Sequence, residues 1–419
     1  MDKELKMMES IKKDSIRFEA NDDLDGLIEA IGDRQFILLG ESSHGTSEFY
    51  KTRMELSKRL IAEKGFSIIA VEGDWPSCFS VNEYIKGYKG ESVFESLNDF
   101  NRWPTWMWAN EEVVSLIEWL KTYNTTMNKN IGFYGIDVYS LWESMEALIK
   151  TLETNNSGDI EKAKKAFSCF EPFYRKPENY GISAVFYGEH CLDEVTDLLT
   201  NLRKNRYQYE KGQEESLNIQ VNALVTQNAE KYYKAMVRGG PDDWNIRDHH
   251  MVNAIEEIVA FYGNNTKVII WEHNTHIGDA RATDMVEEGL VNVGQILREK
   301  YGNDNVFAVG FGTHRGTVIA AKSWGEEMEE MIVPVALDGS WEDLMHRAGA
   351  FNKYLLFHPG NESIFREKIG HRAIGVVYNA EYEHLGNYVP SIMSKRYDAF
   401  FYFDKTTALS PLKMQVLHV

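Results

Sequence analysis

The chain is poor in cysteine and lacks any pairing motif for it. Only Cys78, Cys169 and Cys191 occur among the 419 residues, and no C-x-x-C spacing is present. An odd number of thiols without such spacing is typical of a protein kept in a reducing compartment. The cysteine pattern therefore predicts a cytoplasmic protein.

Positive charge is also scarce. Lys and Arg number 45 against 64 Asp and Glu, which gives a formal net charge of -19 at pH 7. This charge repels a phosphate backbone and an anionic membrane surface, and no basic run offsets it locally. The chain also has no apolar run of membrane-spanning length, and its first residues lack the apolar core of a signal peptide. We therefore expect neither a nucleic-acid partner nor a membrane partner.

What the chain does contain is ample material for a core. It is 43% hydrophobic and 12% aromatic, with 26% charged residues, which is the composition of a globular protein. A length of 419 residues exceeds what one hydrophobic core usually serves. We therefore expect a main domain and a second lobe.

Three apolar runs lead directly into ionisable residues. The junctions are ILLG before Glu41-Ser-Ser-His44-Gly, IIAV before Glu72-Gly-Asp74, and VIIW before Glu272-His273-Asn-Thr-His276. Each run has the length and the β-branched content of a buried strand. In an open parallel sheet the ligand crevice lies beyond the carboxyl ends of the strands, so these endings can converge on one pocket. This arrangement predicts an enzyme.

The order of the segments predicts an α/β fold with a mostly parallel central sheet flanked by helices. A helix is expected over residues 1–31, and a strand, loop and helix follow over 35–64. Later apolar runs, including 306–311, 373–378 and 399–403, add strands, some of them antiparallel at an edge. Residues 141–262 show almost only helical periodicity. We therefore expect a discontinuous α/β catalytic domain at 1–140 and 263–419, with a mainly helical lobe inserted at 141–262.

The loop after the first strand carries the most distinctive chemistry. A histidine at neutral pH can take a proton from water, and a carboxylate beside it can hold the imidazole in the required tautomer. His44 is therefore the natural general base, with Glu41 as its partner. Arg53 lies two turns into the next helix, so it either points back at this loop or forms a surface pair with Glu48 or Glu55.

The other two junctions each allow two interpretations. Glu72 either takes part in the chemistry or caps the turn that contains Trp75. A single histidine in a loop is more often structural, but His273 and His276 flank Asn274 on a third acidic strand ending, which favours function.

Two other mechanisms compete with water activated by His44. One is a metal-dependent reaction, for which five side chains of the junctions would suit a transition metal: Glu41, His44, Glu72, His273 and His276. The H-E-x-x-H motif of zinc hydrolases is absent, however. Ser42 and Ser43 adjoin His44, but the G-x-S-x-G elbow is missing and adjacent Ser and His rarely have the geometry of a nucleophile and its base.

Seven ordered blocks of the chain resemble the erythromycin esterase family, within the EreA/ChaN-like superfamily, and especially its uncharacterised chromosomal bacterial members. The blocks are Gly40-Glu41-Ser42-Ser43-His44-Gly45-Thr46 with Arg53, Val71-Glu72-Gly73-Asp74, Asn101-Arg102-Trp103 through Trp106-Met107-Trp108, Tyr134-Gly135-Ile136-Asp137, Arg247-Asp248-His249-His250-Met251, His273-Asn274-Thr275-His276, and Ile374-Gly375-Val376-Val377-Tyr378 with Tyr397-Asp398-Ala399.

The resemblance implies hydrolysis of a carboxylic ester or lactone by water, in a cleft between the α/β domain and the helical lobe. It implies no cofactor, no catalytic metal and no covalent serine intermediate. The implied catalytic residues are His44 as general base, with Glu41, Glu72, His273, His276 and Arg53. The predicted substrate-binding residues are Trp75, Trp103, Trp106, Trp108, Arg247 and His314. Arg247 is alternatively a helix ion pair with Asp248, and the tryptophans are alternatively core residues.

The family does not fix the substrate, because macrolide resistance belongs to only some of its members. The sequence predicts a small-molecule ester or lactone and leaves the oligomeric state open. Two alternatives remain: a metal-dependent hydrolase, and a non-catalytic protein that binds a metal, haem or another ligand with the same Glu and His residues.

Overall fold

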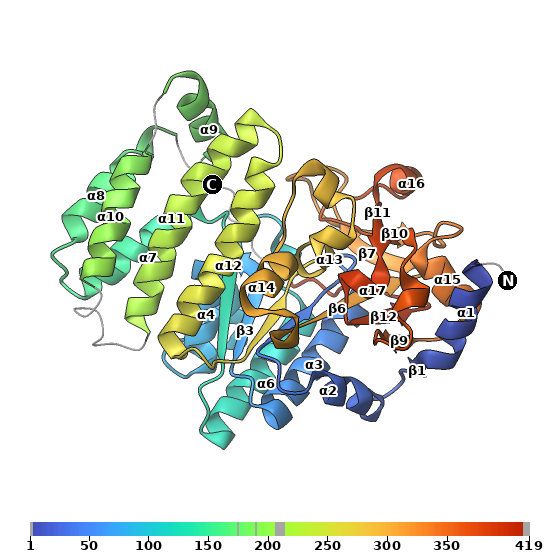
Figure 1. Ribbon diagram of the computed structural model, residues 1–419. Coiled ribbons are helices and arrows are strands. Elements are labelled where there is room, and N and C mark those ends of the chain that lie inside the picture. Colours follow the sequence, from blue (N-terminus) through green and yellow to red (C-terminus); the bar gives the residue numbers. More distant parts are fainter. Residues whose placement is uncertain (1–2, 174–175, 189–190, 206–213, 414–419) are drawn as a thin grey trace. The chain divides into compact units, whose positions relative to one another are not determined.

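The computed structural model describes residues 3–173, 176–188, 191–205 and 214–413 (Figure 1). These residues divide into two compact units. The first unit consists of Met1–Ile69, Ser92–Ile131 and Lys267–Val419, and the second consists of Ala70–Glu91 and Gly132–Thr266. None of the described helices has both the length and the apolar character needed to cross a bilayer.

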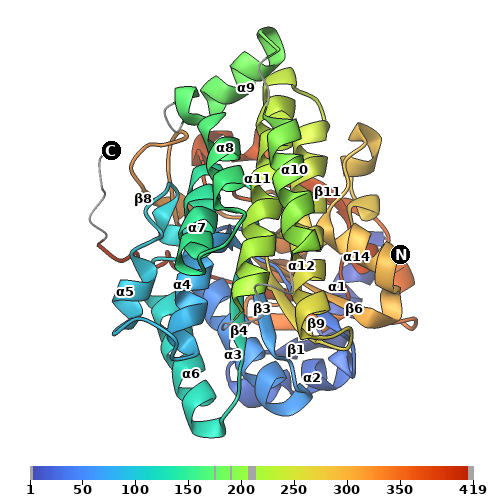
Figure 2. The same cartoon turned by 90° about the vertical axis from the view of Figure 1, so that its left-hand side faces the viewer.

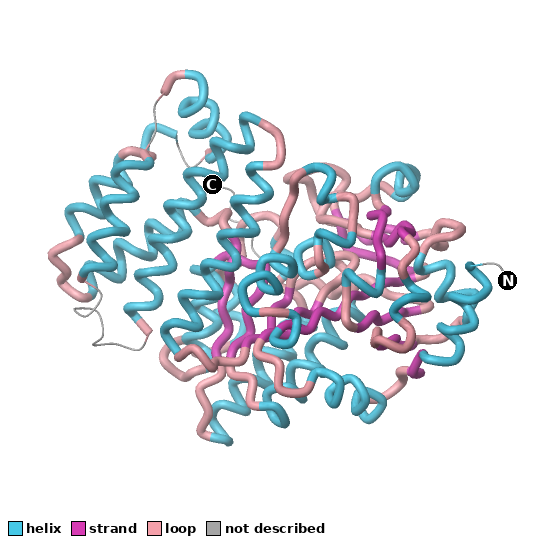
Figure 3. The backbone as a smooth tube through the Cα atoms, in the orientation of Figure 1, coloured by secondary structure: helices cyan, strands magenta, loops and turns pink. Residues whose placement is uncertain are grey.

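The sheet of the first unit is mixed but mainly parallel. Strands are magenta in Figure 3. Its strands follow the order β1 (Ser15–Arg17), β9 (Lys353–Leu356), β12 (Ala399–Phe403), β6 (Val306–Thr313), β2 (Phe36–Leu39) and β5 (Val268–Trp271). Neighbours from β12 to β5 pair in parallel, whereas β9 pairs antiparallel with both β1 and β12. Every residue of β2 and β5 is buried, which explains why these strands are continuous apolar runs.

Helices accompany this sheet. They are α1 (Lys3–Asp14), α2 (Asp25–Ile31), α3 (Ser47–Lys64), α5 (Val93–Leu97), α6 (Glu111–Met127), α13 (Asn274–Ile277), α14 (Val293–Tyr301), α15 (Trp341–Ala348), α16 (Glu383–Gly386) and α17 (Met393–Arg396). Helix α3 packs on α6, α13 and α14 pack on β6, and α1 packs on α15. The predicted α/β fold, a mostly parallel sheet flanked by helices, is confirmed.

Two antiparallel hairpins complete the first unit. They pair β7 (Gly316–Ala320) with β8 (Glu329–Val333), and β10 (Lys368–Arg372) with β11 (Tyr388–Ile392). The predicted strand over 373–378 is wrong, since the structure has only isolated bridges at Ile374 and Val377 there.

The second unit consists mainly of helices (Figure 2). They are α4 (Trp75–Ile85), α7 (Leu141–Thr154), α8 (Ile160–Ser168), α9 (Pro177–Phe186), α10 (Leu192–Lys204), α11 (Glu215–Arg238) and α12 (Asp242–Tyr262), and β3 (Ile68–Asp74) and β4 (Gly132–Asp137) are its strands. The long helix α11 contacts α7, α9, α10 and α12, and α4 packs on β4. Apolar side chains of α7, α8, α10 and α11 form one continuous core.

A disulfide joins Cys169, at the end of α8, to Cys191, at the start of α10. The sequence did not predict this pairing, because the two residues are 22 positions apart and meet only where α8 packs on α10. Cys78 is the remaining thiol and is buried.

Candidate active site

The loop after β2 places a carboxylate against an imidazole, as the sequence predicted for Glu41 and His44. Glu41 Oε1 lies 2.9 Å from His44 Nδ1, and the two residues are 2% and 8% exposed. An ionised carboxylate only accepts hydrogen bonds, so the Nδ1 of neutral His44 carries the proton and Nε2 carries the lone pair. This is the tautomer that a general base needs.

Arg53 reaches back from α3 to this loop and is fully buried. Its Nη2 donates to Glu41 Oε2 at 2.5 Å, a hydrogen bond between two oppositely charged groups. The ring centroids of Tyr50 and Trp271 lie 4.4 and 4.6 Å from the guanidinium carbon, so the cation contacts two aromatic rings. The alternative, a surface pair with Glu48 or Glu55, is wrong, because Arg53 is fully buried; Glu48 binds Thr407 and Glu55 binds Lys58.

Close packing fixes the backbone of the loop. A Cβ on Gly45 would lie 1.9 Å from the carbonyl oxygen of Ile319, so only glycine fits at this position. The carbonyl of Gly45 accepts from the amides of Ile319 and Leu409, both at 3.0 Å. The first amide of α3, that of Ser47, donates to the carbonyl of Thr407 at 2.9 Å and is therefore not available to a substrate.

A second histidine stands beside the first. The rings of His44 and His273 are 4.9 Å apart between centroids and inclined at 44°. His273 precedes α13, and its Nδ1 lies 2.8 Å from Thr275 Oγ1 and accepts from the backbone amide of Thr275 at 3.3 Å. Since a backbone amide can only donate, neutral His273 carries its proton on Nε2. The pair thus offers one imidazole that can take a proton and one that can donate a hydrogen bond.

The remaining residues of this strand ending are buried. Glu272 is fully buried, and His276 on α13 is 2% exposed. The structure thus brings Glu41, His44, Arg53 and His273 together within the first unit and places His276 one turn beyond His273.

The second unit holds its own charged cluster, which contains the predicted Glu72 and Arg247. Arg247 on α12 donates to Glu72 Oε1 at 2.6 Å, and to Asp137 Oδ1 and Oδ2 at 2.9 and 2.8 Å. Its partners therefore include Glu72 in β3 and Asp137 at the end of β4. The partner that the sequence suggested for Arg247 was Asp248. Burial alone would raise the pKa of Asp137, but the guanidinium outweighs it and holds that pKa below its usual value.

The predicted substrate-binding tryptophans are largely buried. Trp106 and Trp108 are 1% and 5% exposed, and Trp103 donates from Nε1 to the carbonyl of Glu326 at 2.8 Å. Trp108 lies 6.3 Å from the ring of Tyr50, which in turn donates to the carbonyl of His44 at 3.2 Å. These contacts connect Trp108 to the His44 loop.

Trp75 lies in the core of the second unit. It is fully buried, stacks on Tyr134 with centroids 5.2 Å apart, and donates from Nε1 to Asn218 at 2.9 Å. Direct contact of Trp75 with a substrate stays a prediction.

His314 belongs to a different cluster of the first unit. Its ring stacks on that of His346 at 3.8 Å, and His346 Nδ1 lies 2.6 Å from Asp404 Oδ1. Burial, with a further contribution from His346, lowers the pKa of His314. His314 follows β6 and Asp404 follows β12, so this cluster lies at the carboxyl edge of the same sheet as the His44 loop.

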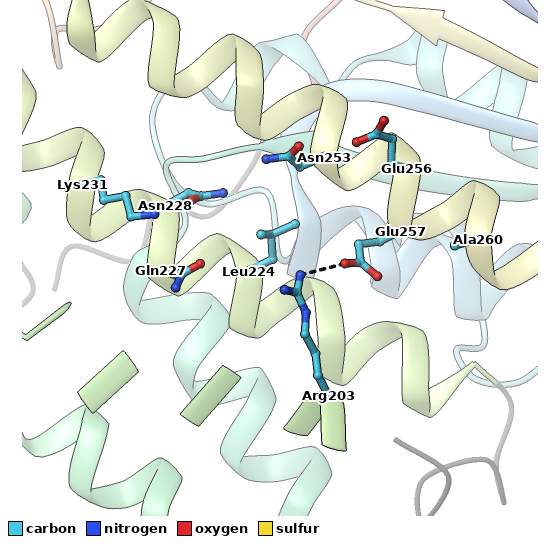
Figure 4. A pocket seen from close by; sticks show the side chains of 9 residues that line it. All are labelled: Arg203, Leu224, Gln227, Asn228, Lys231, Asn253, Glu256, Glu257 and Ala260. Atoms are coloured by element: carbon cyan, nitrogen blue, oxygen red, sulfur yellow. Dashed lines mark hydrogen bonds and ion pairs between the residues drawn. The ribbon is translucent and has the colours of Figure 1, made fainter. Parts of the chain in front are cut away.

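A separate cavity of about 460 Å³ lies among α10, α11 and α12 (Figure 4). Its lining is polar and includes Asn228, Lys231 and an ion pair of 3.0 Å between Arg203 and Glu257. None of the predicted site residues lines it. Within the described ranges, no group of three or more His, Cys, Asp or Glu residues is placed to hold a metal ion.

Sequence reasoning assigned no role to four residues that shape these clusters. They are Tyr50 and Trp271 beside Arg53, Asp137 beside Arg247, and Asn274 behind His273. Tyr50 is one turn from Arg53 on the same helix, and this spacing was the only signal available for it. Trp271 ends an apolar strand, a position that by itself indicates only core.

The chain is similar to proteins of known name over most of its length. Residues 61–406 match the family described as erythromycin esterase. An Escherichia coli protein named erythromycin esterase type II is 22% identical over 397 residues, which cover 84% of this chain and 89% of that protein.

Solved structures share the fold. A Bacillus cereus protein superposes with a TM-score of 0.82 at 17% identity, covering 98% of this chain and 99% of its own. A mutant of erythromycin esterase EreC in its open conformation has a TM-score of 0.67 at 14% identity, with coverage of 97% and 99%.

Proposed function

Because the chain belongs to the erythromycin esterase family, we propose that it hydrolyses carboxylic esters or lactones with water activated by His44. The observation that carries the proposal is the hydrogen bond between Glu41 and His44 Nδ1, which orients the imidazole and makes Nε2 its basic nitrogen. The ion pair of Glu41 with buried Arg53 supports it, since this contact fixes the orientation of the carboxylate.

The reaction requires one proton to move twice. Nε2 of His44 takes a proton from water as the oxygen attacks the ester carbonyl, and a tetrahedral oxyanion forms. The imidazolium then returns the proton to the leaving alkoxide as the C–O bond breaks, which yields a carboxylic acid and an alcohol. Glu41 stabilises the imidazolium between the two steps, as an oriented carboxylate does in hydrolytic triads.

His273 supplies the complementary group. With Nδ1 accepting from Thr275, its Nε2–H is the donor that can stabilise the developing oxyanion. The roles of His276 and Glu72 in binding the ester or orienting the water remain predictions, as do those of the substrate-binding candidates.

The serine alternative has little support from the geometry. Ser43 Oγ is hydrogen-bonded to Thr46 Oγ1, and Ser42 Oγ has no hydrogen-bond partner among the described residues. Neither hydroxyl is bonded to a histidine that could activate it, which favours direct attack by water.

The family and the name of one relative indicate the substrate only as a class of compounds. A relative is named for the hydrolysis of erythromycin, a macrolide lactone, so such a lactone is one candidate substrate for this chain. Simple aryl esters share the same acyl chemistry and serve as general probes.

The test is hydrolysis of a panel of aryl esters and one macrolide lactone by the wild type and His44→Ala. Removal of the general base should lower kcat by about 10²–10⁴. His384→Ala, at an exposed position of α16, is the control and should retain full activity. A His44→Ala rate within a few fold of wild type would remove His44 from the mechanism.

A further inference from the structure

Asn274 joins the two strand endings that carry the histidines. It directly follows His273, and its backbone amide donates to the carbonyl of Glu41 at 2.8 Å. Its side chain forms two hydrogen bonds with the backbone of Phe311 in β6. Nδ2 donates to the carbonyl of Phe311 at 2.6 Å, and Oδ1 accepts from the amide of Phe311 at 3.2 Å. These two hydrogen bonds show which atom of the Asn274 side-chain amide is nitrogen, because a carbonyl cannot donate and a backbone N–H cannot accept.

The second proton of the Asn274 amide is directed at His371. Nδ2 lies 3.1 Å from His371 Nε2, and because the amide nitrogen only donates, that ring nitrogen must be the acceptor. The proton of His371 therefore sits on Nδ1, which lies 2.6 Å from Glu342 Oε1. Asn274 thus donates to His371, and His371 donates to Glu342. All three residues are fully buried.

The backbone of Asn274 is held as firmly as its side chain. Its carbonyl accepts from Arg396 Nη2 at 3.1 Å and from the hydroxyl of Tyr397 at 3.5 Å. A Cβ at Gly40, the residue before Glu41, would lie 2.2 Å from Asn274 Oδ1. The side chain of Asn274 therefore fills the space directly behind the catalytic loop.

We propose that Asn274, His371 and Glu342 are positioning residues that set the His273 imidazole relative to the Glu41 and His44 pair. The proposal rests on the proposed function and extends it to three side chains that touch no reacting atom. A shift of about 1 Å in a catalytic group can cost two orders of magnitude in rate, so a fully hydrogen-bonded support behind His273 acts on kcat.

The surroundings of His371 keep its ring in the required state. The charged and polar groups that face it are Glu342 on α15, Arg372 beside it, and Arg396 and Tyr397 from the segment after β11. Burial outweighs the attraction of Glu342 and lowers the pKa of His371, so the neutral ring with its single acceptor persists at neutral pH.

The first test compares Asn274→Ala with a matched variant elsewhere in the same unit. The side chain of Asn124 on α6 forms the same pair of hydrogen bonds with the backbone of Ile131. Its Oδ1 accepts from the amide at 2.8 Å, and its Nδ2 donates to the carbonyl at 3.1 Å. Both variants lose two bonds to backbone. We expect Asn274→Ala to lower kcat for an aryl ester about 10- to 100-fold with little change in KM, and Asn124→Ala to leave kcat unchanged. Equal effects of the two variants on kcat would overturn the proposal.

A second pair of variants covers the case in which Asn274→Ala does not fold. His371→Gln retains an acceptor for Asn274 and a donor for Glu342, whereas His371→Leu retains neither. We expect His371→Gln to keep most of kcat and His371→Leu to lose as much as Asn274→Ala. Equal kcat for the two His371 variants would contradict the proposal that the hydrogen bonds from Asn274 to His371 and from His371 to Glu342 support catalysis.

A readout without substrate separates this inference from the proposed function. In protein labelled with ¹⁵N-histidine, His371 should show its proton on Nδ1, and Asn274→Ala should shift the ring signals of His44 and His273 while Asn124→Ala does not. These results with no hydrolysis by the wild type would support the positioning role and refute the esterase. If the wild type hydrolyses the esters but the signals of His44 and His273 do not shift in Asn274→Ala, the esterase is supported and the positioning role is refuted.

Discussion

At the scale of single residues, Arg53 shows how strongly one buried charge depends on its partner. The guanidinium and the Glu41 carboxylate are both removed from water, so each is costly without the other. Arg53→Leu should therefore lower the free energy of unfolding by about 3–5 kcal/mol, as measured by urea denaturation. The double variant with Glu41→Leu should recover most of this loss, because no unpaired charge remains. A single variant as stable as the double variant would contradict the buried pair.

His250 on α12 makes stability depend on pH. Burial lowers its pKa from 6.5 to about 4, and its Nδ1 lies 3.0 Å from Asn228 Nδ2. The unfolded chain takes up a proton below pH 6.5 and the folded chain only below about 4, so the unfolded state binds more protons in between. This residue should therefore cost about 3 kcal/mol of stability as the pH falls through that window.

Urea denaturation at pH 7 and at pH 4.5 measures the effect. His250→Asn keeps an acceptor near Asn228 but cannot titrate, so its stability should fall less between the two pH values than that of the wild type. An equal fall in both proteins would show that other groups account for the pH dependence.

The sequence identified the centre of the candidate site but not its supports. Glu41 and His44 were found because ionisable side chains after an apolar strand are unusual, whereas the partner of Arg53 could not be chosen from spacing alone. Asn274 was visible only as a neighbour of two histidines, since its bonds run to Phe311 and His371, 37 and 97 residues away.

At the scale of helices and strands, local pattern failed where tertiary pairing decides. The run over 373–378 is apolar and β-branched, but its hydrogen bonds go to two places: Ile374 donates to Ser42, while Tyr378 donates to Ala321. Neither partner extends far enough to make a strand. Similarly, the predicted helix over 1–31 is interrupted by β1, three residues that pair with β9 from the far end of the chain.

The disulfide between α8 and α10 should stabilise the helical part of the second unit. Closing a loop of 22 residues restricts the unfolded chain by about 3 kcal/mol in the chain-entropy description. Reducing agent should therefore lower the thermal midpoint of the oxidised protein. A Cys169→Ala and Cys191→Ala double variant should already have the lower midpoint and should not respond to the reagent. A wild type that is insensitive to reductant would show that the bond contributes little.

At the scale of the whole molecule, the order of segments was the most reliable information in the sequence. Strand, loop and helix recur at β2 with α3 and at β3 with α4, and this alternation together with buried apolar strands predicts a parallel sheet. Antiparallel strands at an edge were expected, but β1 and β9 could not be identified as those strands, because their pairing joins residues about 340 positions apart.

The bonds around the His44 loop also bear on when this loop can form while the chain is being synthesised. Gly45 and Ser47 are bonded to the backbone of Leu409 and Thr407, so an early loop is held by late residues. A nascent chain that has been synthesised only as far as residue 400 contains every predicted catalytic side chain but not these bonds. We therefore expect this loop to reach its final geometry during synthesis only after residues 407–409 have joined the fold.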